Sequence, residues 1–578
     1  MGGKKQPRTK NNTQPSSSDR HAQRLGTDQL IGFSALSDLG YVPAPVGGAQ
    51  DEGSSGAVSG QMRAVLKKMA KKDATTKSKA TQEFTELCDS HSLDDVKLAL
   101  PFWPRLYRKL ATDVDNRVRE MSHVALQRLL LRVRKAATPH MAELVPVWLC
   151  SQNDPYPPAA TAARRAFQNV FSVPEKQSGA VKFCYSSVLA YVKEGLYDQT
   201  PQTYSDPSVM SVDELEARFV RLLTGCLSGL RELLELLPED PEDARGASSD
   251  QPLADIVTHN KFVKLAKHSH PQVRRWWFCL VSRFCARRPG LVAAAGARLA
   301  PAALHALNER DPAVLTDTWD AAICLVTTVP DCWSLVNVRK AVLPQLWTVL
   351  REGGRGCAVT LHPLMIVLLS RLPQDAAGDP DELHRLFLSS MYQGLSADRV
   401  TQSAREVSVI VRSLLECALY LLRQGCSEPV VAVIVDQLCA VTSDVIAVWR
   451  RTPGPALYRD LVRPELEAGR SELPVQLLAT VYRLCSRQER SQLALDVTRE
   501  GHMSMVLELL RLMERSGPAA DPELASWAVS DQLHAAVLAA VTATSDSGGD
   551  QWQHTLQAIP LLLKDHGKSG PTGALGRS

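Results

Sequence analysis

Aromatic residues and paired cysteines are both scarce in this chain. Aromatics make up 6% of its 578 residues, and none interleaves its lysine clusters, which argues against base stacking on single-stranded nucleic acid. The 13 cysteines are scattered and form no CxxC pair, which excludes zinc ribbons and related fingers within these residues. Scattered thiols also indicate a reducing compartment, the cytosol or the nucleus.

Long apolar runs are missing as well. The N-terminus has no apolar segment of the kind that a secretory signal requires. The longest apolar stretch, 430–449, is interrupted by Asp436, Gln437 and Asp444, so it does not predict a membrane span. The formal net charge of +4 is too small to indicate a partner by itself. We therefore expect no membrane association.

Signatures of catalysis are not found. The sequence contains no P-loop, no Gly-x-Gly-x-x-Gly after a strand and no Gly-x-Ser-x-Gly elbow. Cys88 and His91 have CxxH spacing, but a single pair cannot complete a tetrahedral metal site. We expect no catalytic residue, no metal ligand and no cofactor in this chain.

A helix-opening motif recurs instead, with Asp or His ahead of an apolar stretch. Asp115 and Asp154 lie 39 positions apart, and His270 and Asp311 lie 41 apart. An Asp or His cap can accept from free N–H groups of the helix, and the Pro that follows three of the four occupies a position without a partner. Arg119 and Arg274, four residues after the cap of two of these helices, are expected on the solvent-facing or partner-facing side.

Repeat periods near 40 residues indicate paired-helix units that bury one continuous core. We predict an all-α, HEAT/ARM-type helical-repeat solenoid with a disordered N-terminal tail. The expected divisions are a tail over 1–60, repeats over 61–237, an acidic loop or linker over 238–254, further repeats over 255–564 and a disordered end over 565–578.

Three helical stretches stand out. Ser211 and Glu214 have the spacing of a capping box at the start of a helix that runs to Leu237. Apolar periodicity predicts another helix over 404–423. The aromatic run 276–278 falls at helical positions, where core packing is the expected role and an exposed anchor the alternative.

Basic residues gather in the first predicted repeat. Residues 61–80 contain a single acidic side chain, Asp73, beside seven basic ones. A solvated helix face is one interpretation, and a surface for phosphate-rich nucleic acid is the other. The lysines that are candidates for binding a partner through this surface are Lys67, Lys68, Lys71, Lys72, Lys77 and Lys79.

An apolar island over 31–43 interrupts the polar tail. Its large side chains include Phe33, Leu39 and Tyr41. Apolar residues within a disordered segment are candidates for a docking motif. A staple onto the first helices of the same chain is the alternative.

Several ordered motifs resemble the N-terminal region of listerin, the RING-type E3 ubiquitin ligase family of ribosome-associated quality control. They begin with Met1-Gly2-Gly3-Lys4 and continue with the segments 32–43, 71–84, 100–104, 117–120 and 159–163. The resemblance is ordered over residues 1–190 and weaker beyond them.

The resemblance implies a scaffold whose N-terminal end engages the large ribosomal subunit and the nascent-chain-sensing partner NEMF in the cytosol. In that family a distant RING recruits the ubiquitin-charged E2, and stalled nascent chains are marked for the proteasome. The present sequence reaches Ser578 without RING cysteines, so no catalytic or zinc residue is carried over, and zinc, E2 and ubiquitin are expected only at that RING. A generic HEAT-repeat adaptor for transport or assembly, without a ubiquitin role, is the alternative function.

Overall fold

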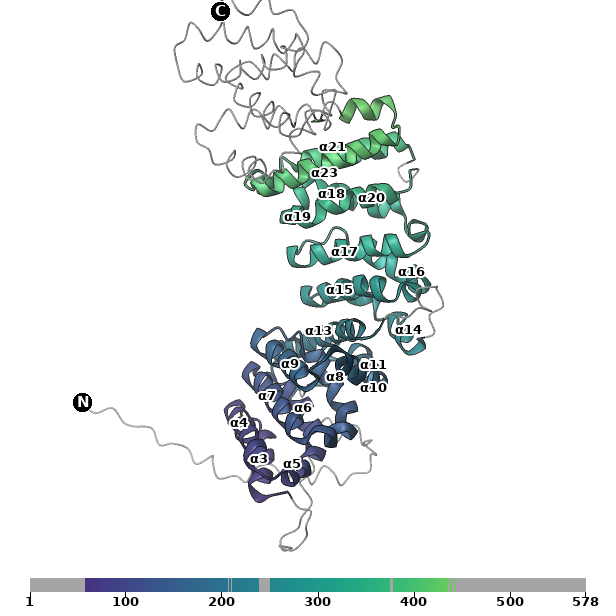
Figure 1. Ribbon diagram of the computed structural model, residues 1–578. Helices are drawn as coiled ribbons and strands as arrows, with labels where there is room; N and C mark the ends of the chain where they lie inside the picture. Colours follow the sequence, from purple (N-terminus) through teal and green to yellow (C-terminus); the bar gives the residue numbers. More distant parts are fainter. Residues whose placement is uncertain are drawn as a thin grey trace, which may run out of the picture. The chain divides into compact units, whose positions relative to one another are not determined.

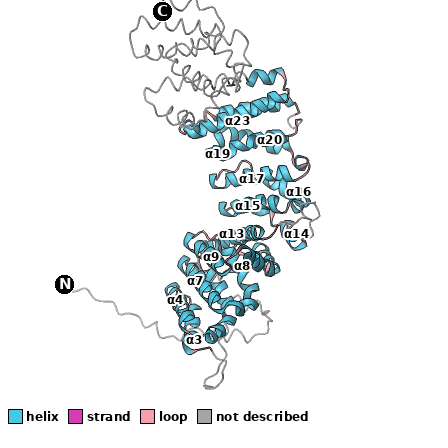
Figure 2. Cartoon of the chain, viewed as in Figure 1, coloured by secondary structure: helices cyan, strands magenta, loops and turns pink. Residues whose placement is uncertain are grey.

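The computed structural model describes residues 58–205, 207–208, 210–238, 250–374, 378–434, 437–438 and 441. Throughout these residues the regular elements are helical and no strand occurs (Figure 1, Figure 2). The predicted all-α, helical-repeat fold is confirmed. None of the described helices combines the length and the apolar character needed to cross a membrane. The chain divides into two compact units, Met1–Leu237 and Pro238–Ser578.

The first unit contains the helices α3 (Gly60–Met69), α4 (Ala74–Ser90), α5 (Leu93–Ala99), α6 (Trp103–Ala111), α7 (Asn116–Val133), α8 (Met141–Ser151), α9 (Pro157–Val170), α10 (Pro174–Phe183), α11 (Tyr185–Lys193), α12 (Pro201–Tyr204) and α13 (Val212–Leu236). They pack in two layers (Figure 1). One layer runs through α4, α7 and α9, and the other through α6, α8 and α13, with α6 against α7 and α8 against α9.

The second unit contains the helices α14 (Gln251–Val257), α15 (Pro271–Arg287), α16 (Pro289–Leu304), α17 (Pro312–Thr328), α18 (Leu343–Arg351), α19 (Ala358–Leu361), α20 (Met365–Arg371), α21 (Pro380–Gly394), α22 (Asp398–Thr401) and α23 (Ala404–Arg423). Helix α15 packs along α17, and α16 packs against both. Helix α23 packs against α20 and α21, and its bounds confirm the helix predicted over 404–423.

Three of the four predicted helix caps form as expected. The carboxylate of Asp115 accepts two backbone N–H groups of α7 at 2.9 Å. Asp311 accepts one at the start of α17 at 2.9 Å, and the Nδ1 atom of His270 accepts one at the start of α15 at 3.3 Å. The reciprocal capping box of Ser211 and Glu214 is also present. Local chemistry therefore fixes where these helices begin.

The fourth cap does not form. Helix α9 begins at Pro157 rather than at Pro155, and Tyr156 holds the N-cap position without a side-chain bond to the helix. The carboxylate of Asp154 accepts from the backbone N–H of Tyr156 at 2.8 Å. Its main partner is a guanidinium group from the preceding repeat, so tertiary contact replaces the local cap.

That partner is Arg119, and its predicted place on the solvent-facing or partner-facing side is wrong, because the side chain is buried. Arg119 is 4% exposed and forms a bidentate ion pair with Asp154 at 2.8 and 2.9 Å. Arg274 forms the same pair with Glu309 at 2.8 and 3.0 Å. The Nη1 atom of each arginine also donates to two carbonyl oxygens of the turn before its own helix. Each arginine thus links the turn before its own helix to an acidic residue 35 positions later in the chain.

Aromatic side chains fill specific places in both cores. In the first unit the rings of Phe84 and Trp103 stack at 4.6 Å, and the Tyr107 hydroxyl lies 3.0 Å from Nδ1 of His123. In the second unit Trp277 and Phe278 are fully buried on α15. The expected core role of the aromatic run 276–278 is therefore confirmed for Trp277 and Phe278, whereas Trp276 is half-buried.

Candidate functional site

The predicted basic cluster lies on α3, α4 and the turn between them. Lys67 and Lys68 end α3, Lys71 and Lys72 lie in the turn, and Lys79 is on α4. All five are exposed. We call these five residues the lysine surface. The N-terminal tail residues Phe33, Leu39 and Tyr41 lie outside the described residues.

Among the lysine surface, only Lys68 has an acidic partner within the described part of the chain. Its ammonium group lies 3.0 Å from Glu83, and both side chains are well exposed. An exposed pair of this kind stabilises by less than about 1 kcal/mol, so it can exchange for another anion. The surface can therefore offer several ammonium groups to a polyanion.

Lys77 departs from this pattern. Its side chain is buried, and its ammonium group forms an ion pair with the equally buried carboxylate of Asp113. Asp113 also accepts from the backbone N–H of Asp115 at 3.0 Å, next to the cap of α7. Lys77 is thus part of the packing between α4 and the turn before α7, and it is not available on the surface.

A second basic run follows on α7 and the turn after it. Arg128, Arg132, Arg134 and Lys135 are all exposed. The guanidinium of Arg132 donates to the carbonyl of His91 at 3.1 Å. Basic residues at the end of a helix also offset the negative end of its dipole, so part of this run has a structural role.

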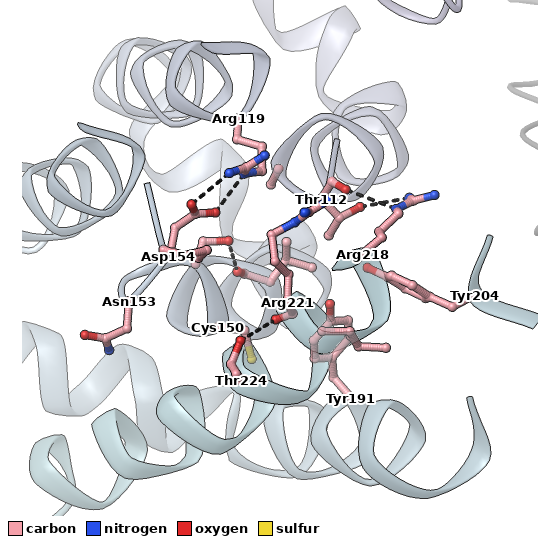
Figure 3. A pocket seen from close by; sticks show the side chains of 16 residues that line it. Thr112, Arg119, Cys150, Asn153, Asp154, Tyr191, Tyr204, Arg218, Arg221 and Thr224 are labelled. Carbon is pink, nitrogen blue, oxygen red and sulfur yellow. Dashed lines mark hydrogen bonds and ion pairs between the residues drawn. The ribbon is translucent and has the colours of Figure 1, made fainter. Parts of the chain in front are cut away.

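A pocket between α8, α11 and α13 contains groups that the sequence patterns do not reveal (Figure 3). Arg218 and Arg221 come from α13, Tyr191 from α11 and Tyr204 from α12. Asp154 and Arg119 form its other polar wall. The only signal in the sequence is that the two α13 arginines are three residues apart, hence on one side of the helix.

The arginines of this pocket differ in their partners. Arg119 is neutralised by Asp154. Within the described residues, Arg218 donates to neutral acceptors, the carbonyl and hydroxyl of Thr112 at 3.2 and 3.4 Å and the hydroxyl of Ser205 at 3.2 Å. For Arg221, the described residues supply no acceptor to Nη2, although this atom is buried.

Tyrosine rings border the pocket as neutral groups. Burial raises the pKa of Tyr191 and that of Tyr204 above the ordinary value. The Arg218 guanidinium lies 4.9 Å above the centre of the Tyr204 ring, and Arg108 lies 5.1 Å above that of Tyr191. Arginine thus covers one face of each ring.

Metal and acid–base chemistry find no support in the described residues. Over that part of the chain, no group of three His, Cys, Asp or Glu side chains is placed to hold a metal ion. Burial lowers the pKa of His123 and of His362 to about 4. Burial also raises the pKa of the Cys88 thiol to about 12, which keeps it protonated and unreactive at neutral pH.

Comparison with known proteins identifies the family. Residues 56–372 match the family described as E3 ubiquitin-protein ligase listerin, N-terminal domain. Listerin of Gallus gallus is 40% identical over 470 residues, which cover 79% of this chain and 26% of the relative. Listerin of Mus musculus is 39% identical over 454 residues, with 77% and 25% covered.

A more distant relative gives the same result. Listerin of Drosophila melanogaster is 31% identical over 439 residues, which cover 73% of this chain and 25% of the relative. The chain therefore spans about a quarter of the length of the curated relatives it matches. The match over 56–372 includes the lysine surface, the arginine-lined pocket (Arg119, Arg218 and Arg221) and the turns linked by Arg119 and Arg274. This chain belongs to the listerin family of E3 ubiquitin-protein ligases, to whose N-terminal domain it corresponds.

Proposed function

We propose that this chain is the ribosome-docking N-terminal part of a listerin-type E3 ubiquitin ligase that acts in the cytosol. Its helical repeats hold the ligase on the large ribosomal subunit beside the partner NEMF. A RING elsewhere in the full ligase, with its zinc ions, then recruits the E2, and ubiquitin marks the stalled nascent chain for proteasomal degradation.

The lysine surface is the observation that supports docking. Four of its five ammonium groups have no acidic partner within the described residues, and the fifth is paired only with exposed Glu83. Ribosomal RNA presents closely spaced phosphates, and each phosphate that a lysine neutralises releases a counterion. The surface has no aromatic side chain among its lysines, so it suits the phosphate backbone rather than a base sequence.

Co-sedimentation tests this proposal. The chain is mixed with large subunits that carry a stalled peptidyl-tRNA, and its pelleting is measured against salt concentration. Four phosphate contacts give a log–log slope of about 3, hence a loss of roughly 60-fold in affinity for a fourfold rise in salt. Charge reversal to Glu is made at Lys67, Lys68, Lys71 and Lys72.

The reversed protein is expected to lose most of its pelleting. A matched control reverses four other exposed lysines, namely Lys176, Lys182, Lys193 and Lys267, and should pellet nearly as the unchanged chain does. Equal pelleting of the two variants would remove the lysine surface from the docking site. No pelleting of the unchanged chain at low salt would favour the generic adaptor.

A further inference from the structure

The arginine-lined pocket of Figure 3 contains more positive than negative charge. Among the described residues, three guanidinium groups line it, from Arg119, Arg218 and Arg221, against one carboxylate, that of Asp154. Both oxygens of that carboxylate are already engaged by Arg119. No other acidic residue of the described lining faces the charges of Arg218 and Arg221.

Arg221 is the least satisfied of the three. Figure 3 shows its side chain extending from α13 towards the side of the pocket where Arg119 and Arg218 lie. Its Nη2 atom is buried, yet no acceptor for it is found among the described residues. A guanidinium group cannot give up its proton in a protein. The Arg221 guanidinium is thus partly desolvated in the folded chain, and it lacks a hydrogen bond that would offset the free-energy cost of that desolvation.

Neighbouring charges strengthen the local positive potential. Lys109 is half-buried near Arg218. Burial lowers its pKa, and so do the positive charges of Lys77 and Arg218, which together outweigh the opposite effect of Asp113. Within the described part of the chain, its ammonium group donates to the carbonyl of Ala70, at 3.1 Å. An incoming oxyanion would relieve repulsion on both Lys109 and the pocket arginines.

We infer that this pocket binds the carboxylate of an acidic peptide segment from a protein partner. The fork of a guanidinium group matches the two oxygens of a carboxylate, as Arg119 and Asp154 already show at this site. Tyr191 and Tyr204 line the pocket, and their rings form an apolar wall for the methylene groups of a glutamate.

Burial favours a peptide over nucleic acid. The pocket cations are half-buried or buried, so the anion must arrive at the end of a flexible stem, as the carboxylate of Asp or Glu does. A phosphodiester is flanked by sugars on both sides. One face of each tyrosine ring is also covered by arginine, which leaves less ring surface for a nucleobase to stack on.

A peptide-binding assay tests the inference and contains no ribosome, so its outcome is separate from that of the docking proposal. Fluorescein-labelled hexaglutamate is titrated with the full chain, and binding is followed by fluorescence anisotropy. Arg221→Gln should weaken binding about tenfold, since it removes one charge-assisted bidentate contact. Lys176→Gln removes one exposed charge outside both the pocket and the lysine surface and should change the affinity less than about twofold.

Two further measurements complete the test. Arg221→Gln removes an uncompensated buried charge, so its melting temperature should not fall below that of the unchanged chain. If it does fall, Arg221→Lys replaces it, because lysine keeps the charge and loses the fork; it too should weaken binding. Equal effects of Arg221→Gln and Lys176→Gln, binding of hexaglutamine, or displacement of hexaglutamate from the pocket by hexauridylate at equal concentration would overturn the inference.

Discussion

Single residues in this chain show that burial determines what a charged side chain does. Lys67 and Lys77 are both lysines of the same basic run, yet the first is exposed and the second is paired with Asp113 inside the first unit. Arg119 likewise connects two turns from a buried position. A basic side chain that has an acidic partner in the interior is therefore buried with that partner and is not available on the surface.

The pair of Arg119 and Asp154 gives a stability prediction. Asp154→Ala leaves a buried guanidinium without its carboxylate, which should lower the free energy of unfolding by about 3–5 kcal/mol. Urea denaturation followed by circular dichroism measures this change. Asp94→Ala provides the control, since the Asp94 side chain is 89% exposed in its pair with Lys97; its cost should stay within about 1 kcal/mol. Similar losses for both variants would contradict the role assigned to Arg119.

Buried His123 gives a pH prediction. Burial lowers its folded-state pKa to about 4, below the unfolded value of about 6.5. The unfolded chain therefore binds the proton first as the pH falls, and stability is lost between pH 6.5 and 4, by at most roughly 3 kcal/mol from this group. His123→Gln should make the melting temperature less steep in pH over this window. An unchanged slope would show that His123 does not contribute to it.

At the scale of elements, caps fix helix ends and close contacts fix helix pairs. Ser211 and Glu214 close the start of α13 from within the sequence. The packing of α13 on α8 depends instead on Gly229, because a Cβ there would lie 2.6 Å from the Sγ of Cys150 and 3.0 Å from its Cα. A sequence pattern marks the first feature, whereas the second requires the partner helix.

The same substitution at two glycines should have opposite effects. Gly229→Ala forces α8 and α13 apart and should destabilise the first unit by about 1–3 kcal/mol. Gly179 lies within α10, where an added Cβ would meet no heavy atom within 4 Å. Gly179→Ala should therefore stabilise by about 0.5–1 kcal/mol, since alanine favours the helix. Melting temperatures of the two variants measure the contrast, and a loss of stability at both positions would be inconsistent with it.

At the scale of the whole molecule, helical repeats provide a surface rather than a reaction centre. Each repeat needs only its neighbours for burial, so a long chain can expose several separate binding features. The lysine surface and the arginine-lined pocket are two such features in the first unit.

Ubiquitin transfer gives a prediction at this scale. A RING-type ligase holds its zinc ions with paired Cys and His ligands, and no CxxC pair occurs in these 578 residues. We expect incubation with E1, a charged E2 and ubiquitin to yield no conjugates above the level without the chain. Gel analysis of the products measures this, with a listerin RING fragment as the positive control. Conjugates formed by the chain alone would disprove the prediction.

The sequence was sufficient for features that depend on neighbours along the chain. Caps at Asp115, His270 and Asp311 and the bounds of α23 follow from interactions within a few residues. The all-helical class follows from apolar periodicity, and the family from ordered motifs. These signals come from residues close together in the sequence, so they can be recognised without knowing how the helices pack.

Tertiary structure alone decided the outcomes that depend on distant residues. Asp154 binds Arg119 from 35 positions away instead of capping α9, and Lys77 binds Asp113 from 36 positions away. Arg221 meets the other pocket residues only because α13 packs on α8. The reason is physical: the strength of a charge interaction depends on desolvation and on the three-dimensional distance to its partner, neither of which is written in sequence spacing.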